Sequence, residues 1–204
     1  MNKLRLATLA RQFLTSSGWF RSVESGIPVD ARGPVPWFTC PAIRFLNPIA
    51  GKDYRVLEFG SGSSTHWWSE RGREVVSVEH DPGWAHRFRE TAAPNVSLIE
   101  RTVDEIIPPA HRGFLYESYF PLGLGARLST DPMRNHAAGL LDDRFLAYAT
   151  VVLDYPKGHF DIILVDGMAR ILTAWLAAAC VSEHGLIVFD NSDRNEYGDA
   201  YAAA

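Results

Sequence analysis

The stretch Arg55-Val56-Leu57-Glu58-Phe59-Gly60-Ser61-Gly62-Ser63-Ser64-Thr65 decides the fold that we expect for this chain. A short apolar run with an acid is followed by a glycine pair, by hydroxyl residues and by a segment that suits a helix. This order is typical of a strand, a tight turn and the start of a helix. The glycines let the backbone turn sharply and approach a ligand, because a Cβ there would collide with it. The hydroxyl residues can cap the helix, whose free N–H groups then face the same ligand.

The acid in this stretch separates classes of ligand. A carboxylate such as Glu58 suits a ligand that carries an ammonium group or hydroxyls, and it is a poor neighbour for a pyrophosphate. The dinucleotide-binding fingerprint needs Gly-x-Gly-x-x-Gly, and Thr65 stands at the place of the third glycine. A P-loop is excluded, because no Gly-Lys-Ser/Thr follows. An NAD-dependent oxidoreductase is therefore an alternative that the pattern disfavours.

Length and composition are ordinary for a soluble globular protein. The chain has 204 residues, of which 47% are hydrophobic and 22% charged, and this length fits one domain with an appendage. The net charge of −4 gives no basic footprint for nucleic acid. The longest nearly apolar run, residues 171–181, is too short to span a bilayer, and the N-terminus lacks the pattern of a secretion signal. We expect a cytoplasmic protein with no membrane partner, in which Cys40 and Cys180 are reduced packing residues.

Residues 1–50 are predicted to form an N-terminal helical and Pro-rich extension. Apolar residues recur at helical spacing over residues 4–14, which indicates an amphipathic helix that covers one face of the main domain. Residues 27–41 are rich in Pro and Gly and should run extended. Trp37 and Phe38 in this segment are expected to be packing residues, with a wall of a substrate pocket as the alternative.

Residues 51–204 are predicted to be an α/β domain. Three further segments have the pattern of a buried strand with a terminal acid: residues 74–79 end on Glu79, residues 160–166 on Asp166, and residues 185–190 on Asp190, which Asn191 follows. A strand is also expected at residues 96–99. Helical segments alternate with the strands, which predicts a doubly wound, mostly parallel, Rossmann-like sheet with helices on both faces.

The four acids are expected to meet at one edge of this sheet, because ligands gather outside the carboxyl ends of parallel strands. Glu79 follows Glu58 by about twenty residues, where nucleotide-binding domains place the carboxylate that binds ribose hydroxyls. Thr102, Val103 and Asp104 come after the third strand and are candidates for contact with an adenine.

Residues 106–139 interrupt the alternating pattern with prolines, glycines and aromatic residues. Such a long irregular connection is uncommon unless it is functional or disordered. We interpret it as a lid or substrate-selecting insertion, with a partner-binding surface as the alternative. A helix is expected at residues 140–153.

Residues 56–191 resemble the class I S-adenosylmethionine (SAM) dependent methyltransferases. The resemblance is carried by Val56-Leu57-Glu58-Phe59-Gly60-Ser61-Gly62, Val76-Ser77-Val78-Glu79, Asp161-Ile162-Ile163-Leu164-Val165-Asp166-Gly167 and Gly185-Leu186-Ile187-Val188-Phe189-Asp190-Asn191. It implies a sheet of order 3-2-1-4-5 and a bound SAM whose amino group lies near Glu58, whose methionine part approaches Gly60 and Gly62, and whose ribose meets Glu79. The residues implied to bind SAM are Glu58, Gly60, Ser61, Gly62, Ser64, Glu79, His80, Thr102, Val103 and Asp166.

The ends of the fourth and fifth strands also resemble those of catechol-type O-methyltransferases. This resemblance implies that Asp166, Asp190 and Asn191 are catalytic and that they hold a Mg²⁺ ion, whose preferred ligands are oxygens. Those enzymes carry a lysine base three residues after the first acid, and here that place is Ala169. Arg170 is adjacent but stays protonated, so it cannot be a base.

Members of the family usually add an antiparallel hairpin after the fifth strand, and the sequence ends at Ala204 with no residues left to form it, which implies either a shortened variant or a fragment. If the hairpin is absent, the fifth strand is expected to be an open edge that invites pairing with a second copy, that is, a homodimer.

The predicted function is transfer of a methyl group from SAM to an oxygen or nitrogen of a small-molecule acceptor, with an O-methyltransferase preferred. His66 and His80 are weaker candidates for direct participation. The alternatives are the NAD-dependent oxidoreductase and a non-catalytic SAM-binding or interaction protein, which would have no use for Asp166 and Asp190.

Overall fold

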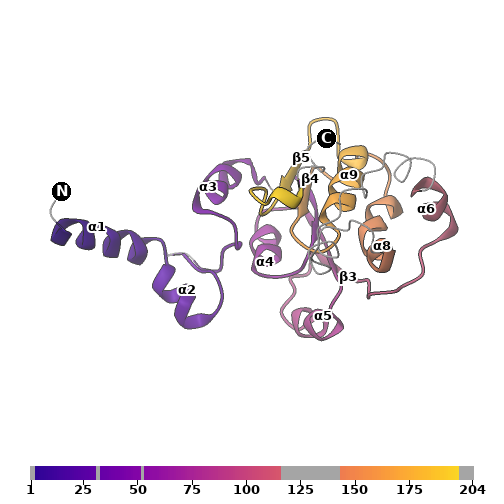
Figure 1. Ribbon diagram of the computed structural model, residues 1–204. Helices are drawn as coiled ribbons and strands as arrows, with labels where there is room; N and C mark the ends of the chain where they lie inside the picture. Colours follow the sequence, from indigo (N-terminus) through magenta and orange to yellow (C-terminus); the bar gives the residue numbers. More distant parts are fainter. Residues whose placement is uncertain (1–2, 31–32, 52, 116–142, 198–204) are drawn as a thin grey trace.

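The computed structural model describes residues 3–30, 33–51, 53–115 and 143–197, and its centre is one parallel sheet (Figure 1). The sheet has five strands in the order β3-β2-β1-β4-β5, and every neighbouring pair is parallel. The strands are β1 (Arg55–Phe59), β2 (Glu74–Glu79), β3 (Val96–Glu100), β4 (Ile162–Val165) and β5 (Leu186–Phe189). The predicted fold class and strand order are therefore confirmed.

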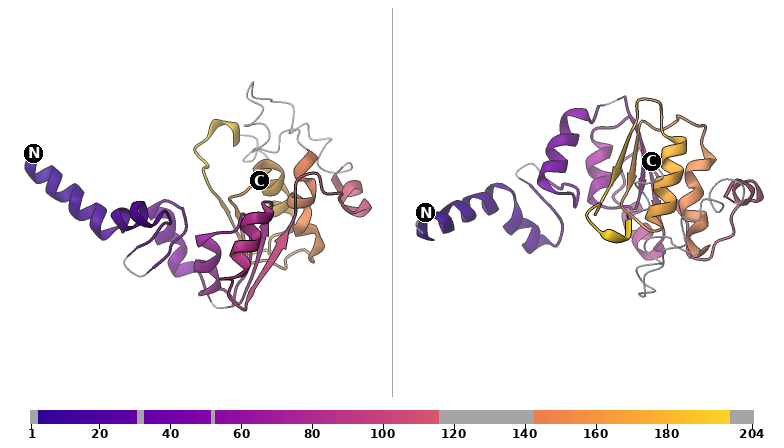
Figure 2. Two further views of the ribbon diagram at one scale, coloured as in Figure 1. Left: turned by 90° about the horizontal axis from the view of Figure 1, so that it is seen from below. Right: turned by 45° about the horizontal axis from the view of Figure 1, so that its top comes forward.

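Helices cover both faces of the sheet, as Figures 1 and 2 show. One face carries α3 (Cys40–Ile49), α4 (Ser63–Ser69) and α5 (Pro82–Arg89). The other face carries α8 (Leu146–Ala149), η4 (Thr150–Asp154) and α9 (Arg170–Cys180). Shorter elements are α6 (Pro109–Phe114), η3 (Asp143–Phe145) and η5 (Asn195–Tyr197).

The alternation of side chains along β1 produces two separate cores. Leu57 and Phe59 point to the face of α8 and α9, whereas Val56 joins Leu46 and Trp68 in the core beneath α3 and α4. All residues of β4 are buried, because a central strand of a parallel sheet is covered on both faces. This burial explains why its sequence is continuously apolar.

The N-terminal helices α1 (Lys3–Ser16) and α2 (Trp19–Ser25) form an arm that projects from the domain (Figures 1 and 2). The helix predicted at residues 4–14 is confirmed, but its expected packing against the main domain is wrong: no residue of α1 or α2 is buried. The position beside the sheet is taken by α3, which Thr39 caps and which buries Leu46. Because α3 already fills this face, the apolar residues of α1 remain exposed.

The segment predicted as an irregular insertion begins with packed structure. Ile107 and Leu115 are buried and α6 lies between them. Residues 116–142 are outside the described residues, so the predicted lid stays a prediction. The helix expected at residues 140–153 is present from Asp143 as η3, α8 and η4. Among the helices that the structure describes, none is both long and apolar enough to cross a membrane.

Candidate functional site

The carboxyl ends of the central strands lie in register and form one rim. Phe59 of β1 is paired with Val78 of β2 and with Val165 of β4, which in turn pairs with Phe189 of β5. The next residue on each of these strands therefore stands in the same row. These residues are Gly60, Glu79, Asp166 and Asp190. Glu58 lies on β1, two residues before Gly60. The structure therefore brings the four predicted acids to a single edge of the sheet.

The loop after β1 turns at Gly60, whose φ of 100° favours glycine. The backbone at Gly60 also runs close to β4: a Cβ built there would lie 3.3 Å from Gly167 Cα. A Cβ on Gly62 would have no described atom within 4 Å, so Gly62 borders open space beside the rim. Helix α4 begins at Ser63, which directs its first N–H groups toward this space.

Glu58 is fully buried under the first turn of α4. Its Oε2 accepts hydrogen bonds from Thr65 Oγ1 and from Ser77 Oγ, and Thr65 Oγ1 in turn accepts one from the Gly62 N–H at 2.9 Å. No described residue donates a hydrogen bond of good geometry to Oε1. Burial raises the pKa of Glu58 to about 7, although the hydroxyls of Ser64, Thr65 and Ser77 offset part of this effect. Glu58 is thus a buried acceptor whose Oε1 is approached by the Ser64 hydroxyl but has no hydrogen bond of good geometry from the described residues.

Glu79 is nearly as buried, but its carboxylate is fully engaged. Oε2 accepts from the N–H and hydroxyl of Ser61, at 3.0 and 2.9 Å, and Oε1 accepts from the N–H groups of His80 and Asp81, at 2.8 and 2.9 Å. Burial alone raises the pKa of Glu79, but these bonds and the His80 side chain together lower it to about 2. Glu79 therefore stays ionised and ties the glycine loop to the end of β2.

Two aromatic side chains at this edge were not predicted. The indole Nε1 of Trp84, on α5, donates to Ser61 O at 2.8 Å and so fixes the glycine loop from outside. Tyr148 is fully buried below the rim, and burial followed by the charges of Glu79, Asp166 and Glu58 raises its pKa. Its hydroxyl would lie 1.9 Å from a Cβ on Gly167, so Gly167 must lack a side chain. Trp84 falls inside a helical segment and Tyr148 inside another, and neither has a signal in the sequence that marks it.

The two histidines differ in placement. His80 lies on the rim, with Nδ1 3.0 Å from Glu79 Oε1 and its ring edge-on to Phe145. The ring of His66 instead packs on Phe88, with centroids 4.8 Å apart, and Nε2 lies 3.5 Å from Thr91 Oγ1. None of these contacts of His66 involves the rim acids.

The loop after β3 reaches the rim beside Glu79. The Arg101 N–H donates to Glu79 O at 2.8 Å, which places Thr102 and Val103 next to the end of β2. Asp104 has a φ of 65°, an uncommon value for a residue with a side chain. The candidates for adenine contact therefore lie in the loop after β3, next to the end of β2, and their role stays a prediction.

Asp166, Asp190 and Asn191 lie together, but the guanidinium of Arg170 lies among them. Arg170 Nη2 donates to Asp166 Oδ1 at 3.1 Å, and Nη1 donates to Asn191 Oδ1 at the same distance. Burial, then the neighbouring Asp190, raises the pKa of Asp166 to about 8, and Arg170 opposes this rise. In the described part of the chain, no group of three His, Cys, Asp or Glu side chains is arranged to hold a metal. Arg170 thus holds one carboxylate oxygen of Asp166 and the amide oxygen of Asn191, and its Nη1 lies 3.9 Å from Asp190 Oδ2. These residues do not fit the Mg²⁺ ion that the sequence suggested, because a cation of the chain already stands among them.

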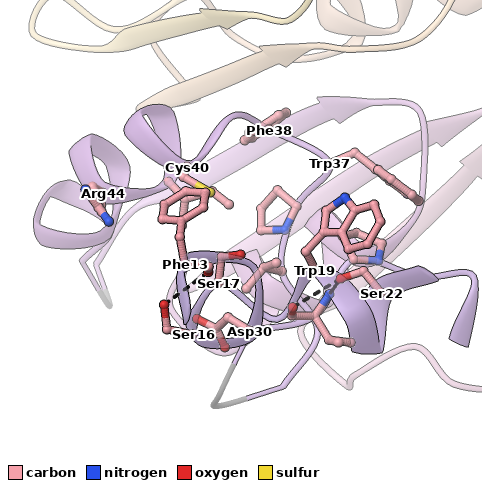
Figure 3. A pocket seen from close by; sticks show the side chains of 15 residues that line it. Phe13, Ser16, Ser17, Trp19, Ser22, Asp30, Trp37, Phe38, Cys40 and Arg44 are labelled. Atoms are coloured by element: carbon pink, nitrogen blue, oxygen red, sulfur yellow. Dashed lines mark hydrogen bonds between the residues drawn. The ribbon is translucent and has the colours of Figure 1, made fainter. Parts of the chain in front are cut away.

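A separate cavity of about 380 Å³ lies between the N-terminal arm and α3 (Figure 3). Its wall includes Phe13, Trp19, Trp37, Phe38 and Cys40. Phe38 is buried in the core with Leu46, which agrees with its expected packing role, whereas Trp37 is exposed at the cavity. None of the residues lining this cavity belongs to the rim.

Comparisons with known proteins agree with the fold. No protein-family model matches the chain, and no curated protein sequence matches it. A crystal structure of a methyltransferase-like protein from Silicibacter pomeroyi DSS-3 is similar with a TM-score of 0.54 and 20% identity, over 83% of this chain and 80% of that one. Precorrin-8w decarboxylase from Methanobacterium thermoautotrophicum has a TM-score of 0.44 and 14% identity, over 80% of this chain and 68% of that one. YcgJ from Bacillus subtilis has a TM-score of 0.41 and 13% identity, over 74% and 50%. By the first of these likenesses, the chain has the Rossmann-like α/β fold found in a methyltransferase-like protein.

Proposed function

We propose that this protein transfers a methyl group from SAM to an oxygen or nitrogen of a small-molecule acceptor. One observation carries the proposal: Glu58 is completely buried beside an open glycine loop, and apart from the Ser64 hydroxyl, whose approach falls short of good hydrogen-bond geometry, no described residue offers a donor to its Oε1. A buried polar atom without a partner is uncommon in a native structure and calls for an explanation. The ammonium group of an amino-acid ligand would supply the missing donor and the missing positive charge.

The remaining features of the rim suit the rest of such a ligand. The open space at Gly62 and the start of α4 lie next to Glu58 and would receive the methionine part. Glu79 stands at the end of the next strand, and because its two oxygens already accept four hydrogen bonds from the chain, ribose hydroxyls would bind it by replacing a donor such as the Ser61 hydroxyl. Thr102 and Val103 lie in the loop after β3, so the three parts of SAM would meet the ends of β1, β2 and β3 in order.

The chemistry asks mainly for alignment. SAM brings a methyl group on a sulfonium, which is already a good leaving group, so the protein has to position the two reactants in line. Such alignment accounts for about 7–11 kcal/mol of an activation barrier in favourable cases. Asp166 lies at the rim, where burial and then the neighbouring Asp190 raise its pKa, so the ionised fraction that remains near neutral pH is a basic carboxylate that can accept a proton. We assign it the role of orienting and deprotonating the acceptor, with Asp190 and Asn191 beside it.

Isothermal calorimetry with SAM and with NAD tests the ligand. SAM is expected to bind and NAD is not, because Thr65 stands where the dinucleotide fingerprint has its third glycine, and because the ionised form of Glu58 would repel a pyrophosphate. Binding of NAD without SAM would instead assign the chain to the oxidoreductases.

A screen of small acceptors with methyl-labelled SAM tests the transfer itself. In Asp166→Ala, SAM affinity should survive while labelled product disappears. The exposed Asp193 provides a matched control, since Asp193→Ala leaves the rim intact. If Asp166→Ala turned over as fast as the unaltered protein, Asp166 would have no part in the reaction. Binding of SAM with no product from any acceptor would favour the non-catalytic alternative.

A further inference from the structure

Arg170 is the one rim side chain whose donors are all used inside the rim. Its Nε donates to Gly167 O at 3.0 Å. Its Nη1 donates to Asp190 O and Asn191 Oδ1, at 2.8 and 3.1 Å. Its Nη2 donates to Asp166 O and Asp166 Oδ1, at 2.9 and 3.1 Å. The five N–H groups of a guanidinium thus meet five different oxygens, which come from the loops after β4 and β5.

These oxygens are the kind of ligand that a hard divalent cation prefers. Three are backbone carbonyls, one is a carboxylate and one is a side-chain amide, and Ca²⁺ and Mg²⁺ sites are built from the same groups. An arginine cannot lose its proton in a protein, so the positive charge at this point is permanent. The position between these five oxygens is therefore occupied by a positively charged group of the chain itself.

The surroundings hold this cation in place. Arg170 is only 9% exposed, and its Cζ lies 5.7 Å from the ring centroid of Tyr197, which is itself buried. Ala169 and Asn191, one in each loop, have φ values of 50° and 55°. Such values are unfavourable for a residue like alanine and persist only where neighbouring contacts impose them. The bonds to Arg170 are contacts of that kind.

We propose that Arg170 is a positioning residue that takes the place of a divalent metal ion at the ends of β4 and β5. It fixes the Asp166 and Asn191 side chains and the two loops that carry them, so that no metal is needed to order the acceptor side of the rim. The effect of Arg170 on turnover rests on the methyl transfer proposed above. The expectation that Arg170 replaces a bound metal ion does not. A lysine would keep the charge but has only three donors on one nitrogen, so charge alone would not restore the arrangement.

The first experiment measures the unaltered protein. Titration calorimetry with MgCl₂ and thermal unfolding with and without Mg²⁺ should show no binding and no shift, and methyl transfer should be unchanged after treatment with EDTA. Mg²⁺ binding that Asp166→Ala abolishes would overturn the proposal. Loss of turnover in EDTA with recovery in Mg²⁺ would also overturn it.

The second experiment removes the guanidinium and returns it. Arg170→Ala should lower kcat by about 100-fold, the size of effect that misplacement of reactive groups by about 1 Å produces, with a smaller change in the KM for SAM. Guanidinium chloride, at concentrations far below those that unfold the protein, should restore part of the kcat of Arg170→Ala and raise its unfolding temperature. The control is Arg89→Ala, which removes a half-exposed arginine paired with Glu100 and should show neither the loss nor the rescue.

Three outcomes would contradict the positioning role: rescue of Arg170→Ala by Mg²⁺ but not by guanidinium, full activity of Arg170→Lys, or normal kcat in Arg170→Ala. If Arg170→Ala does not fold, the Mg²⁺ titration of the unaltered protein and the kcat of Arg170→Lys still decide the question. SAM calorimetry on the unaltered protein is carried out in parallel. Failure to bind SAM removes the proposed function, whereas Mg²⁺ binding at Asp166 removes the role of Arg170.

Discussion

Burial keeps Glu58 protonated up to neutral pH, and this gives the candidate site a pH signature. Its pKa is about 7 instead of the ordinary 4.5, so the ligand-free protein loses stability as pH rises from 4.5 to 7 and changes little above that range. An ammonium ligand needs the ionised form. The proton must therefore leave Glu58 before or during binding.

SAM affinity should accordingly increase by about fivefold between pH 6 and pH 7, because the ionised fraction of a group with this pKa increases by that factor. Calorimetry at the two pH values measures the change. Glu58→Gln should bind SAM weakly, and its affinity should not increase with pH. Any pH dependence that remains in this variant reports the titration of the ligand itself. Equal pH dependence in both proteins would remove Glu58 from the ligand site.

Glu79 has the opposite signature, because its four hydrogen bonds favour the ionised form. Its pKa is lowered from 4.5 to about 2, so its contribution to stability is complete above pH 4.5 and is lost as pH falls toward 2. This contribution is about 3 kcal/mol. Urea unfolding at a series of acid pH values should show the loss in the unaltered protein and a much flatter profile in Glu79→Gln. Glu100→Gln is the control at the end of the neighbouring strand, where the carboxylate is paired only with the half-exposed Arg89. A steep acid profile in Glu79→Gln would contradict the assignment.

Two glycines of the rim should respond oppositely to the same substitution. Gly62→Ala adds a methyl group to open space, so the unfolding temperature should stay unchanged while SAM affinity falls. Gly167→Ala places a methyl group 1.9 Å from the Tyr148 hydroxyl and 2.9 Å from Phe59 O, which should cost about 1–3 kcal/mol of stability. The double variant Gly167→Ala, Tyr148→Phe should recover part of this loss, because it removes the nearer atom. Unchanged SAM affinity in Gly62→Ala would mean that the ligand does not approach this loop.

At the scale of elements, α1 and α2 are separate from the two cores. Removal of residues 1–25 should leave the unfolding temperature and SAM binding nearly unchanged, because no described residue of either helix is buried. Leu46→Ala in α3 should instead lose about 2–5 kcal/mol, since Leu46 is 2% exposed in the core beneath α3 and α4. Differential scanning calorimetry of both variants measures the contrast. Collapse of the truncated protein would mean that the arm stabilises the domain after all.

Strand β5 forms an edge of the described sheet, pairing with β4 alone among the described strands. An exposed edge presents unpaired N–H and C=O groups to another chain. The expected homodimer rests on this edge and stays a prediction.

For the molecule as a whole, the ligand should stabilise the fold. A ligand that binds only the folded state at 100 times its Kd adds about 2.7 kcal/mol to the free energy of unfolding. The rim joins loops from all five strands. The bound ligand should therefore raise the unfolding temperature of the whole domain, and not that of one part of it. Thermal unfolding with saturating SAM, compared with the same concentration of NAD, measures it. A rise with NAD alone would contradict the proposed ligand.

The strands and the edge at which the acids meet could be predicted from local patterns in the sequence. A continuous apolar run such as Ile162–Val165 favours a strand buried on both faces, and a glycine turn followed by hydroxyl residues is typical of a helix that begins at a strand end, so these signals are local. The likeness of four such segments to one family then supplied the strand order.

Only the tertiary structure decided what surrounds each acid. Glu58 and Glu79 look alike in sequence, but Glu58 Oε1 lacks a described hydrogen bond of good geometry whereas Glu79 is satisfied by the loop of Ser61, because the contacts come from residues on other elements. The same holds for Asp166 and Asn191, which suggested a metal site until packing placed Arg170 among their oxygens. It also holds for α1, whose apolar stripe predicted a buried face that α3 already occupies. A pattern in the sequence reports what a side chain can do, and the neighbours that decide what it does are set by packing between segments far apart in the chain.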